Sequence, residues 1–167
     1  IDGIGGGWLL APAFRRLRAR GVPTARFMYS VLPWRMPFLN LRTHKKILVI
    51  DDTPTMRLIV TGMLEDLGFT QIAQAESADM GWDLIQSGKF DLILCDWNMP
   101  GKSGLELLRI IRANAQTAKL PLIMMTSNND PVQIAEARSS GVSNYLVKPF
   151  GALDLSERMN EAFLAHS

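Results

Sequence analysis

Several apolar segments of the sequence end abruptly in side chains that can bind a phosphoryl group or a metal ion. Apolar runs bounded by turn residues are typical of buried parallel strands, whose carboxyl ends meet at one edge of an open α/β sheet, where ligands bind. These side chains are Asp51 and Asp52 after residues 46–50, Asp96 after residues 92–95, Thr126 after residues 120–125 and Lys148 after residues 143–147. We therefore expect three carboxylates, a hydroxyl and an ammonium group to converge at one edge.

The residue types in this predicted cluster are suited to phosphoryl transfer. Crowded carboxylates repel one another unless a cation joins them. Mg²⁺ uses a few carboxylates, keeps water ligands and takes further oxygens from phosphate. A carboxylate such as Asp96 can attack phosphorus and form an aspartyl phosphate. Lys148 and Thr126 are suited to the other oxygens of the same group, so the cluster predicts Mg²⁺-dependent phosphoryl transfer to an aspartate.

Each of these residues also has a simpler structural interpretation. Asp51 and Asp52 can be solvated acids that cap a helix, Asp96 can form an Asx turn, and Lys148 can be a surface lysine in a turn. These interpretations do not explain why four predicted strands all end in side chains that fit phosphate or metal. The cluster as a whole therefore favours a functional site.

The elements that must position the cluster alternate regularly from Lys46 onward. The pattern predicts strands at residues 46–50, 71–75, 92–96, 120–125 and 143–147. It predicts helices at residues 54–67, 78–86, from 104 through at least 111, 131–140 and 153–164. Helical crossovers make neighbouring strands parallel and cover both faces of the sheet. We therefore expect an α/β fold with a doubly wound parallel sheet.

The first predicted helix shows its buried face in the spacing of its apolar residues. Thr53 and Pro54 are suited to the N-cap and first helical positions, and Gly68 to the end. The residues expected on the apolar face are Met56, Ile59, Val60, Met63, Leu64 and Leu67.

The charge distribution separates an N-terminal segment from the rest of the 167 residues. Residues 1–46 carry nine Lys/Arg and one acidic residue, a net charge of +8, whereas residues 47–167 carry nine and fifteen, a net charge of −6. The basic character therefore belongs to the segment and does not indicate that the domain binds nucleic acid. We expect residues 1–45, rich in Gly, Pro and Arg, to be a poorly ordered extension before a domain at 46–167. An organelle transit peptide, or a basic arm for a membrane surface or nucleic acid, is the alternative.

The single cysteine and the hydropathy pattern bear on the compartment. Cys95 lies in an apolar run, so no disulfide forms within the chain, which suits a reducing cytosol. No apolar run reaches the roughly 18–20 residues that a membrane span needs. We therefore expect a cytoplasmic protein without a membrane span.

The motifs Asp51-Asp52, Asp96, Thr126-Ser127 and Lys148-Pro149 resemble, in order and spacing, the receiver domains of two-component response regulators. The resemblance covers about residues 45–166 and is strongest to the single-domain chemotaxis members of the CheY type. The segments that carry this stronger likeness are residues 96–100, 104–108 and 148–150. The resemblance implies a flavodoxin-like (βα)₅ fold with strand order 2-1-3-4-5.

The resemblance also implies a role for each site residue. Asp96 is expected to accept the phosphoryl group, and Thr126 and Lys148 to bind it. Asp51, Asp52, Asp96 and the backbone carbonyl of Asn98 are expected to hold Mg²⁺. Tyr145 is expected to act with Thr126 as the switch. The sequence departs from many members at Lys102-Ser103, where an acid commonly precedes the glycine, and at Asn128, which replaces an acid of enteric CheY.

These expectations describe a single-domain response regulator. A histidine kinase or histidine phosphotransfer protein supplies the phosphoryl group, and the output is partner binding, most simply to the flagellar motor switch in chemotaxis. About twenty residues follow Lys148, which leaves no room for a DNA-binding output domain. The alternatives are a phosphorelay shuttle or adaptor, a clipped receiver of a larger regulator, and a pseudo-receiver that binds partners without phosphorylation.

Overall fold

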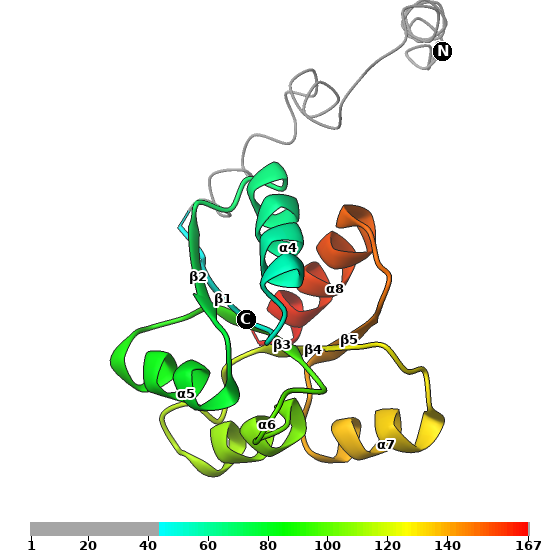
Figure 1. The fold of residues 1–167 in the computed structure, drawn as a ribbon. Coiled ribbons are helices and arrows are strands. Elements are labelled where there is room, and N and C mark those ends of the chain that lie inside the picture. Colours follow the sequence, from blue (N-terminus) through cyan, green and yellow to red (C-terminus); the bar gives the residue numbers. More distant parts are fainter. Residues whose placement is uncertain (1–43, 167) are drawn as a thin grey trace, which may run out of the picture. The chain divides into compact units, whose positions relative to one another are not determined.

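The computed structural model describes residues 44–166, which contain one parallel sheet (Figure 1). The strands are β1 (Lys46–Ile50), β2 (Gln71–Ala75), β3 (Leu92–Asp96), β4 (Leu122–Thr126) and β5 (Asn144–Val147). Their order across the sheet is β2-β1-β3-β4-β5, and every neighbouring pair is parallel. The flavodoxin-like order implied by the resemblance is confirmed.

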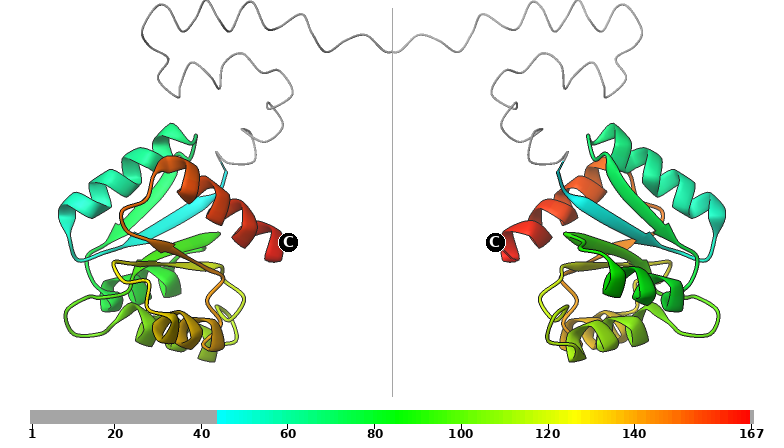
Figure 2. Two further views of the ribbon diagram at one scale, coloured as in Figure 1. Left: turned by 90° about the vertical axis from the view of Figure 1, so that its right-hand side faces the viewer. Right: turned by 90° about the vertical axis from the view of Figure 1, so that its left-hand side faces the viewer.

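Five helices alternate with the strands in this part of the chain, as predicted. They are α4 (Pro54–Asp66), α5 (Ala78–Ser87), α6 (Gly104–Ala113), α7 (Pro131–Ser139) and α8 (Ala152–Ala165). Helices α4 and α8 cover one face of the sheet, and α5, α6 and α7 cover the other (Figures 1 and 2). This layout determines where the site residues lie, because each strand ends at the edge of the sheet from which the next helix starts.

Local capping explains where several helices begin. Ser77 accepts a hydrogen bond from the Met80 N–H at the start of α5. Ser103 and Glu106 form a reciprocal capping box at the start of α6. Asp130 accepts from the Val132 N–H, and Pro131 follows as the first residue of α7.

Two strands begin later than predicted. The prediction placed the fourth strand at residues 120–125, but β4 spans Leu122–Thr126. Pro121 cannot donate a ladder hydrogen bond, and the Leu120 N–H bonds instead to the Thr117 carbonyl within a turn. Strand β5 starts at Asn144 because Ser143 uses its hydroxyl to accept from the Leu122 N–H.

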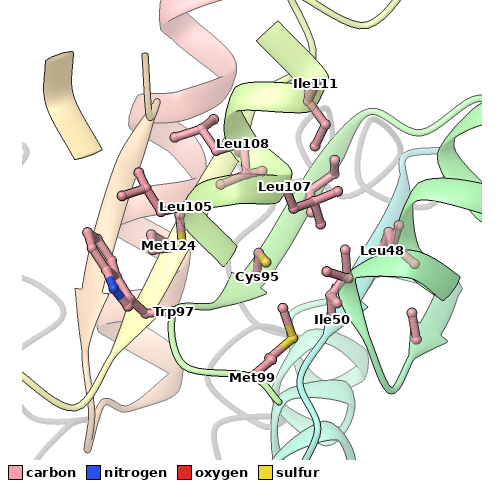
Figure 3. Close-up of a cluster of buried hydrophobic side chains, with 14 of the residues drawn as sticks. Leu48, Ile50, Cys95, Trp97, Met99, Leu105, Leu107, Leu108, Ile111 and Met124 are labelled. Atoms are coloured by element: carbon pink, nitrogen blue, oxygen red, sulfur yellow. The ribbon is translucent and has the colours of Figure 1, made fainter. Parts of the chain in front are cut away.

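Two apolar clusters, one on each face, bury the sheet. Strands β3 and β4 are buried along their whole length. On the face that α5, α6 and α7 cover, the cluster includes Leu48, Ile50, Cys95, Met124 and the residues of α6 shown in Figure 3. The opposite cluster joins β1, β3 and β4 to α4 and α8. The three strands that supply or precede Asp51, Asp96 and Thr126 are therefore the most deeply buried strands of the described sheet.

Helix α4 buries a narrower face than predicted. Val60, Leu64 and Leu67 pack into the core, but Ile59 is 44% exposed and Leu58 is 71% exposed. The prediction that Ile59 belongs to the buried face is wrong. Each residue turns the helix by about 100°, so Val60 points at the sheet while Ile59, its neighbour, points towards solvent.

The lengths and hydropathy of the helices bear on whether any of them could cross a membrane. None of those within residues 44–166 combines the length and apolar character that crossing a bilayer requires.

Candidate functional site

The ends of four strands bring the predicted polar residues to one edge of the sheet. Asp51 directly follows β1, Asp96 ends β3, Thr126 ends β4 and Lys148 directly follows β5. Asp51, Asp96 and Thr126 have relative exposures of 1%, 6% and 2%, and they are the only buried polar residues in the part of the chain that the structure describes. Because buried polar groups are costly without partners, their placement at one edge indicates a built site.

Lys148 joins the two buried carboxylates. Its Nζ donates to Oδ2 of Asp51 at 2.8 Å and to Oδ1 of Asp96 at 2.5 Å. The Lys148 side chain is only 15% exposed. Its backbone N–H donates to the Thr126 carbonyl at 2.7 Å, which continues the β4–β5 ladder by one residue. The sheet therefore positions Lys148 so that its ammonium group lies between Asp51 and Asp96, which are 97 and 52 positions away in the sequence.

The remaining oxygens of both carboxylates are held by backbone amides. Oδ1 of Asp51 accepts from the Thr53 N–H at 2.9 Å. Oδ2 of Asp96 accepts from the Asn98 N–H at 2.9 Å. Each carboxylate is thus held on one side by a backbone N–H and on the other by Lys148, and these two contacts together fix the orientation of Asp96.

Burial and charge act in opposite directions on Asp96 and Lys148. Burial raises the pKa of Asp96 above its ordinary value, and the hydrogen bond and charge of Lys148 oppose that rise only in part. Burial alone lowers the pKa of Lys148, but its hydrogen bonds to Asp51 and Asp96 raise it overall. Lys148 is therefore held as a cation, while the Asp96 carboxylate is a buried anion whose charge is incompletely compensated.

Cys95 lies next to Asp96 but is a poor alternative nucleophile. Its side chain is fully buried, and burial raises the pKa of the thiol far above its ordinary value. Since the thiolate is the reactive form, Asp96 is the better candidate nucleophile.

Thr126 and Tyr145, the predicted switch pair, lie on the same face of neighbouring strands. The Thr126 hydroxyl donates to the Asn128 carbonyl at 3.1 Å and accepts from the Asn128 N–H at 3.1 Å. Tyr145 is half-buried and packs against the cluster that contains Trp97 and Met124. In this structure the hydroxyl is therefore engaged with the loop after β4 and not with Lys148.

Asp52 and Asn98 lie at the same edge, but neither is joined to Lys148. Asp52 is partly exposed, and no described group forms a hydrogen bond or ion pair with its carboxylate. Asn98 is exposed. Within residues 44–166, no three His, Cys, Asp or Glu side chains are gathered in an arrangement that could hold a metal ion. The oxygen donors supplied by Asp51, Asp52, Asp96 and the Asn98 carbonyl are nonetheless the kind that Mg²⁺ binds.

Sequence reasoning missed two residues that support the site. A Cβ atom on Gly104 would lie 2.1 Å from the Asp96 carbonyl oxygen, so only glycine fits where α6 starts behind Asp96. Arg57 donates through Nη1 to the Asp51 carbonyl at 2.7 Å. Gly104 was identified only as a helix start, and nothing in the sequence distinguishes Arg57 from other surface arginines.

A comparison with known protein families decides the classification. Residues 47–160 match the response regulator receiver domain. The chain belongs to this family. Receiver domains generally bind Mg²⁺ at their acidic site, which agrees with the kind of oxygen donors found here.

Among characterised proteins, receiver domains from chemotaxis systems are similar to this one. The chemotaxis protein CheY of Pseudomonas aeruginosa is 44% identical over 118 residues, covering 71% of this chain and 95% of the relative. CheY-3 of Vibrio cholerae is 42% identical over 123 residues, covering 74% of this chain and 95% of the relative. The receiver domain is therefore closely related to CheY.

Solved structures give the same result for the fold. CheY4 of Vibrio cholerae, a chemotaxis response regulator, superposes with a TM-score of 0.66 at 29% identity, covering 71% of this chain and 98% of that one. A receiver domain from Clostridium thermocellum superposes with a TM-score of 0.67 at 32% identity, covering 72% and 95%. The match extends over nearly the whole of each relative.

Proposed function

We propose that this protein is a single-domain response regulator that accepts a phosphoryl group on Asp96. The donor is a histidine kinase or a histidine phosphotransfer protein. The observation that carries the proposal is the Lys148 ammonium held between Asp51 and Asp96 at the carboxyl edge of a receiver-domain sheet. A nucleophile and a cation that can neutralise the transferred group are thus adjacent.

The chemistry follows from these positions. An oxygen of the Asp96 carboxylate attacks phosphorus, a P–O bond to Asp96 forms, and the bond from phosphorus to the donor breaks with its electron pair leaving on the donor. Lys148 exchanges part of its contact with Asp96 for a phosphoryl oxygen, and Thr126 exchanges Asn128 for another. Bound Mg²⁺, held by Asp51, Asp52, Asp96 and the Asn98 carbonyl, would neutralise charge on the phosphoryl oxygens.

The surroundings of the site support a macromolecular donor. Large apolar side chains are exposed in the first or second turns of four helices, which begin at the same edge as the site. Such side chains around the edge of a site are available for contact with a partner protein. They are Leu58 on α4, Met80 on α5, Val132 on α7 and Leu153 on α8.

The output of the proposed regulator is binding to an effector. The similar proteins of Pseudomonas aeruginosa and Vibrio cholerae are chemotaxis proteins, so the flagellar motor switch is the first effector to test. The lone, reduced Cys95 agrees with a cytoplasmic site of action. Affinity capture of partners with and without beryllofluoride, a phosphoryl mimic, identifies those that bind only the activated form.

Phosphorylation by a small donor tests the proposal directly. With Mg²⁺ and acetyl phosphate, mass spectrometry under acidic quench should show one added phosphoryl group, located on Asp96. Asp96→Asn keeps the size of the side chain but removes the nucleophile, so labelling should vanish. Asp83→Asn, at an exposed position on α5, is the matched control and should label normally.

The outcomes separate the proposal from its rivals. Undiminished labelling of the Asp96→Asn protein would contradict the assignment of the acceptor. A folded protein that neither accepts a phosphoryl group nor binds beryllofluoride would instead be a pseudo-receiver that acts by constitutive binding.

A further inference from the structure

An arginine on α7 lies over the ring of the predicted switch residue Tyr145. The guanidinium carbon of Arg138 is 5.6 Å from the centre of the Tyr145 ring. Arg138 is exposed in the last turn of α7, and Tyr145 is half-buried in β5. This distance falls within the range in which a cation is attracted by the face of an aromatic ring.

The contact matters because α7 is weakly anchored. All of α7 is described, and Ala137 is its only buried residue. On another part of the helix, Glu136 forms an exposed ion pair with Arg109 of α6 at 2.8 Å. Exposed ion pairs contribute little to stability. With so little of α7 buried, the contact between Arg138 and Tyr145 is one of the few described interactions that join this helix to the sheet.

The direction of a Tyr145 movement follows from the strand register. Tyr145 is paired with Met124 of β4, and Thr126 lies two residues further along the same strand. Residues two apart in a strand point to the same face, so the Tyr145 ring and the Thr126 side chain share the face that α7 covers. If Thr126 turns towards a phosphoryl group on Asp96, the space that Tyr145 enters lies along β4, away from Arg138.

We infer that Arg138 is a positioning residue that holds Tyr145 in its resting position. Activation must then break this contact, so Arg138 opposes activation and couples the ring to α7. The inference rests on the proposed function, because it takes Tyr145 as the group that moves when Asp96 is phosphorylated.

The test follows Tyr145 directly during activation. The chain has two tyrosines, so ¹³C-labelled tyrosine rings give two sets of NMR signals, and Tyr145→Phe assigns them. Beryllofluoride is titrated in the presence of Mg²⁺ into the unaltered chain, Arg138→Ala and Arg138→Lys. Lys119→Ala removes one positive charge from an exposed position in the loop after α6, which makes it the matched control.

The expected result is a graded change in affinity for the mimic. Loss of an exposed cation–π contact should tighten beryllofluoride binding by about two- to fivefold in Arg138→Ala. Arg138→Lys keeps the charge and should restore part of the difference, whereas Lys119→Ala should bind as the unaltered chain does. In the absence of mimic, the Tyr145 ring signals should move furthest towards their activated positions in Arg138→Ala, less far in Arg138→Lys, and not at all in Lys119→Ala.

Two different failures are distinguishable. If the unaltered chain responds to beryllofluoride and Arg138→Ala has the same affinity and the same Tyr145 signals, Arg138 does not position the ring. If the unaltered chain does not respond to beryllofluoride at all, both the proposed function and this inference are wrong.

Discussion

Asp96 is the residue at which the proposed function and the stability of the fold are in conflict. Two buried carboxylates share one ammonium group, and burial raises the pKa of Asp96 despite Lys148. An acid whose pKa is raised in the folded state favours folding when protonated and disfavours it when ionised. The charge that Asp96 would need as the proposed nucleophile therefore weakens the fold at neutral pH.

Replacing this charge should stabilise the protein. Asp96→Asn leaves Lys148 paired with Asp51 and should raise the free energy of unfolding at pH 7 by about 0.5–2 kcal/mol, the usual gain from removing a strained functional group. The gain should appear as the pH rises from the ordinary aspartate pKa of 3.8 through the raised folded value, and should be absent below that window. Urea denaturation of both proteins between pH 3.5 and about 7 measures it; a loss of stability at pH 7 would show that Asp96 is fully compensated by Lys148.

The proposed metal ligand Asp52 is tested by fluorescence. Trp97 follows Asp96 and is 8% exposed, so Mg²⁺ binding at the site should change its emission. Affinity should be weak because Mg²⁺ keeps several water ligands. In a chain that begins at His44, which lacks Trp8 and Trp34, Asp52→Asn should abolish the change and Asp83→Asn should retain it. An unchanged titration of Asp52→Asn would remove Asp52 from the metal site.

At the residue scale, the sequence was sufficient to predict which polar side chains gather at one edge of the sheet but not all their contacts. Asp51, Asp96, Thr126 and Lys148 were identifiable because each ends an apolar run, and the ends of parallel strands form the edge at which such sheets bind ligands. The Arg57 contact with the Asp51 carbonyl could not be predicted. It depends on the side-chain conformation of a long surface residue, which leaves no periodic signal.

At the scale of elements, the close approach of α6 to Asp96 restricts the residue type at the start of this helix. Gly104 approaches the Asp96 carbonyl so closely that a methyl group at this position must displace the backbone of the proposed acceptor. Gly62, inside α4, has open space where a Cβ atom would lie, with no atom within 4 Å apart from its chain neighbours and the backbone of its own helix, and therefore tolerates a side chain. The same substitution should consequently have opposite effects at the two glycines.

Thermal and urea denaturation can measure this contrast. Gly104→Ala should destabilise the fold by about 1–3 kcal/mol or more through overpacking, and should slow phosphorylation by moving Asp96. Gly62→Ala should stabilise it by about 0.5–1 kcal/mol, because alanine is the better helix former. Equal effects at both positions would mean that the loop before α6 adapts freely.

Helix and strand ends show where sequence patterns lose precision. The starts of α6 and α7 were predicted at residues 104 and 131, where the structure places them, and Ser103 and Asp130 each accept a capping hydrogen bond there. The buried face of α4 was predicted too broadly, because a run of apolar residues does not reveal which one turns away from the sheet. Ile59 is the residue that turns away, and together with its neighbour Leu58 it is exposed to solvent.

At the scale of the whole molecule, the two clusters of residues 44–166 form a complete core. We therefore predict that a chain beginning at His44 unfolds cooperatively within a few degrees of the full-length chain, as the composition of residues 1–45 also suggests. Circular dichroism during heating measures this. A broad transition, or a large fall in the melting temperature, would show that the N-terminal segment contributes to the core. The predicted character of that segment lies outside the described residues.

The contact between Lys148 and Asp51 joins residues 97 positions apart. During synthesis, Asp51 and Asp96 leave the ribosome well before Lys148, and β5, an edge strand, is the last strand of the sheet to be synthesised. Until then the two acids have no ammonium group between them. If the proposed function holds, we expect a chain that stops before Lys148 to be a poor phosphoryl acceptor, because it lacks the cation that would neutralise the transferred group.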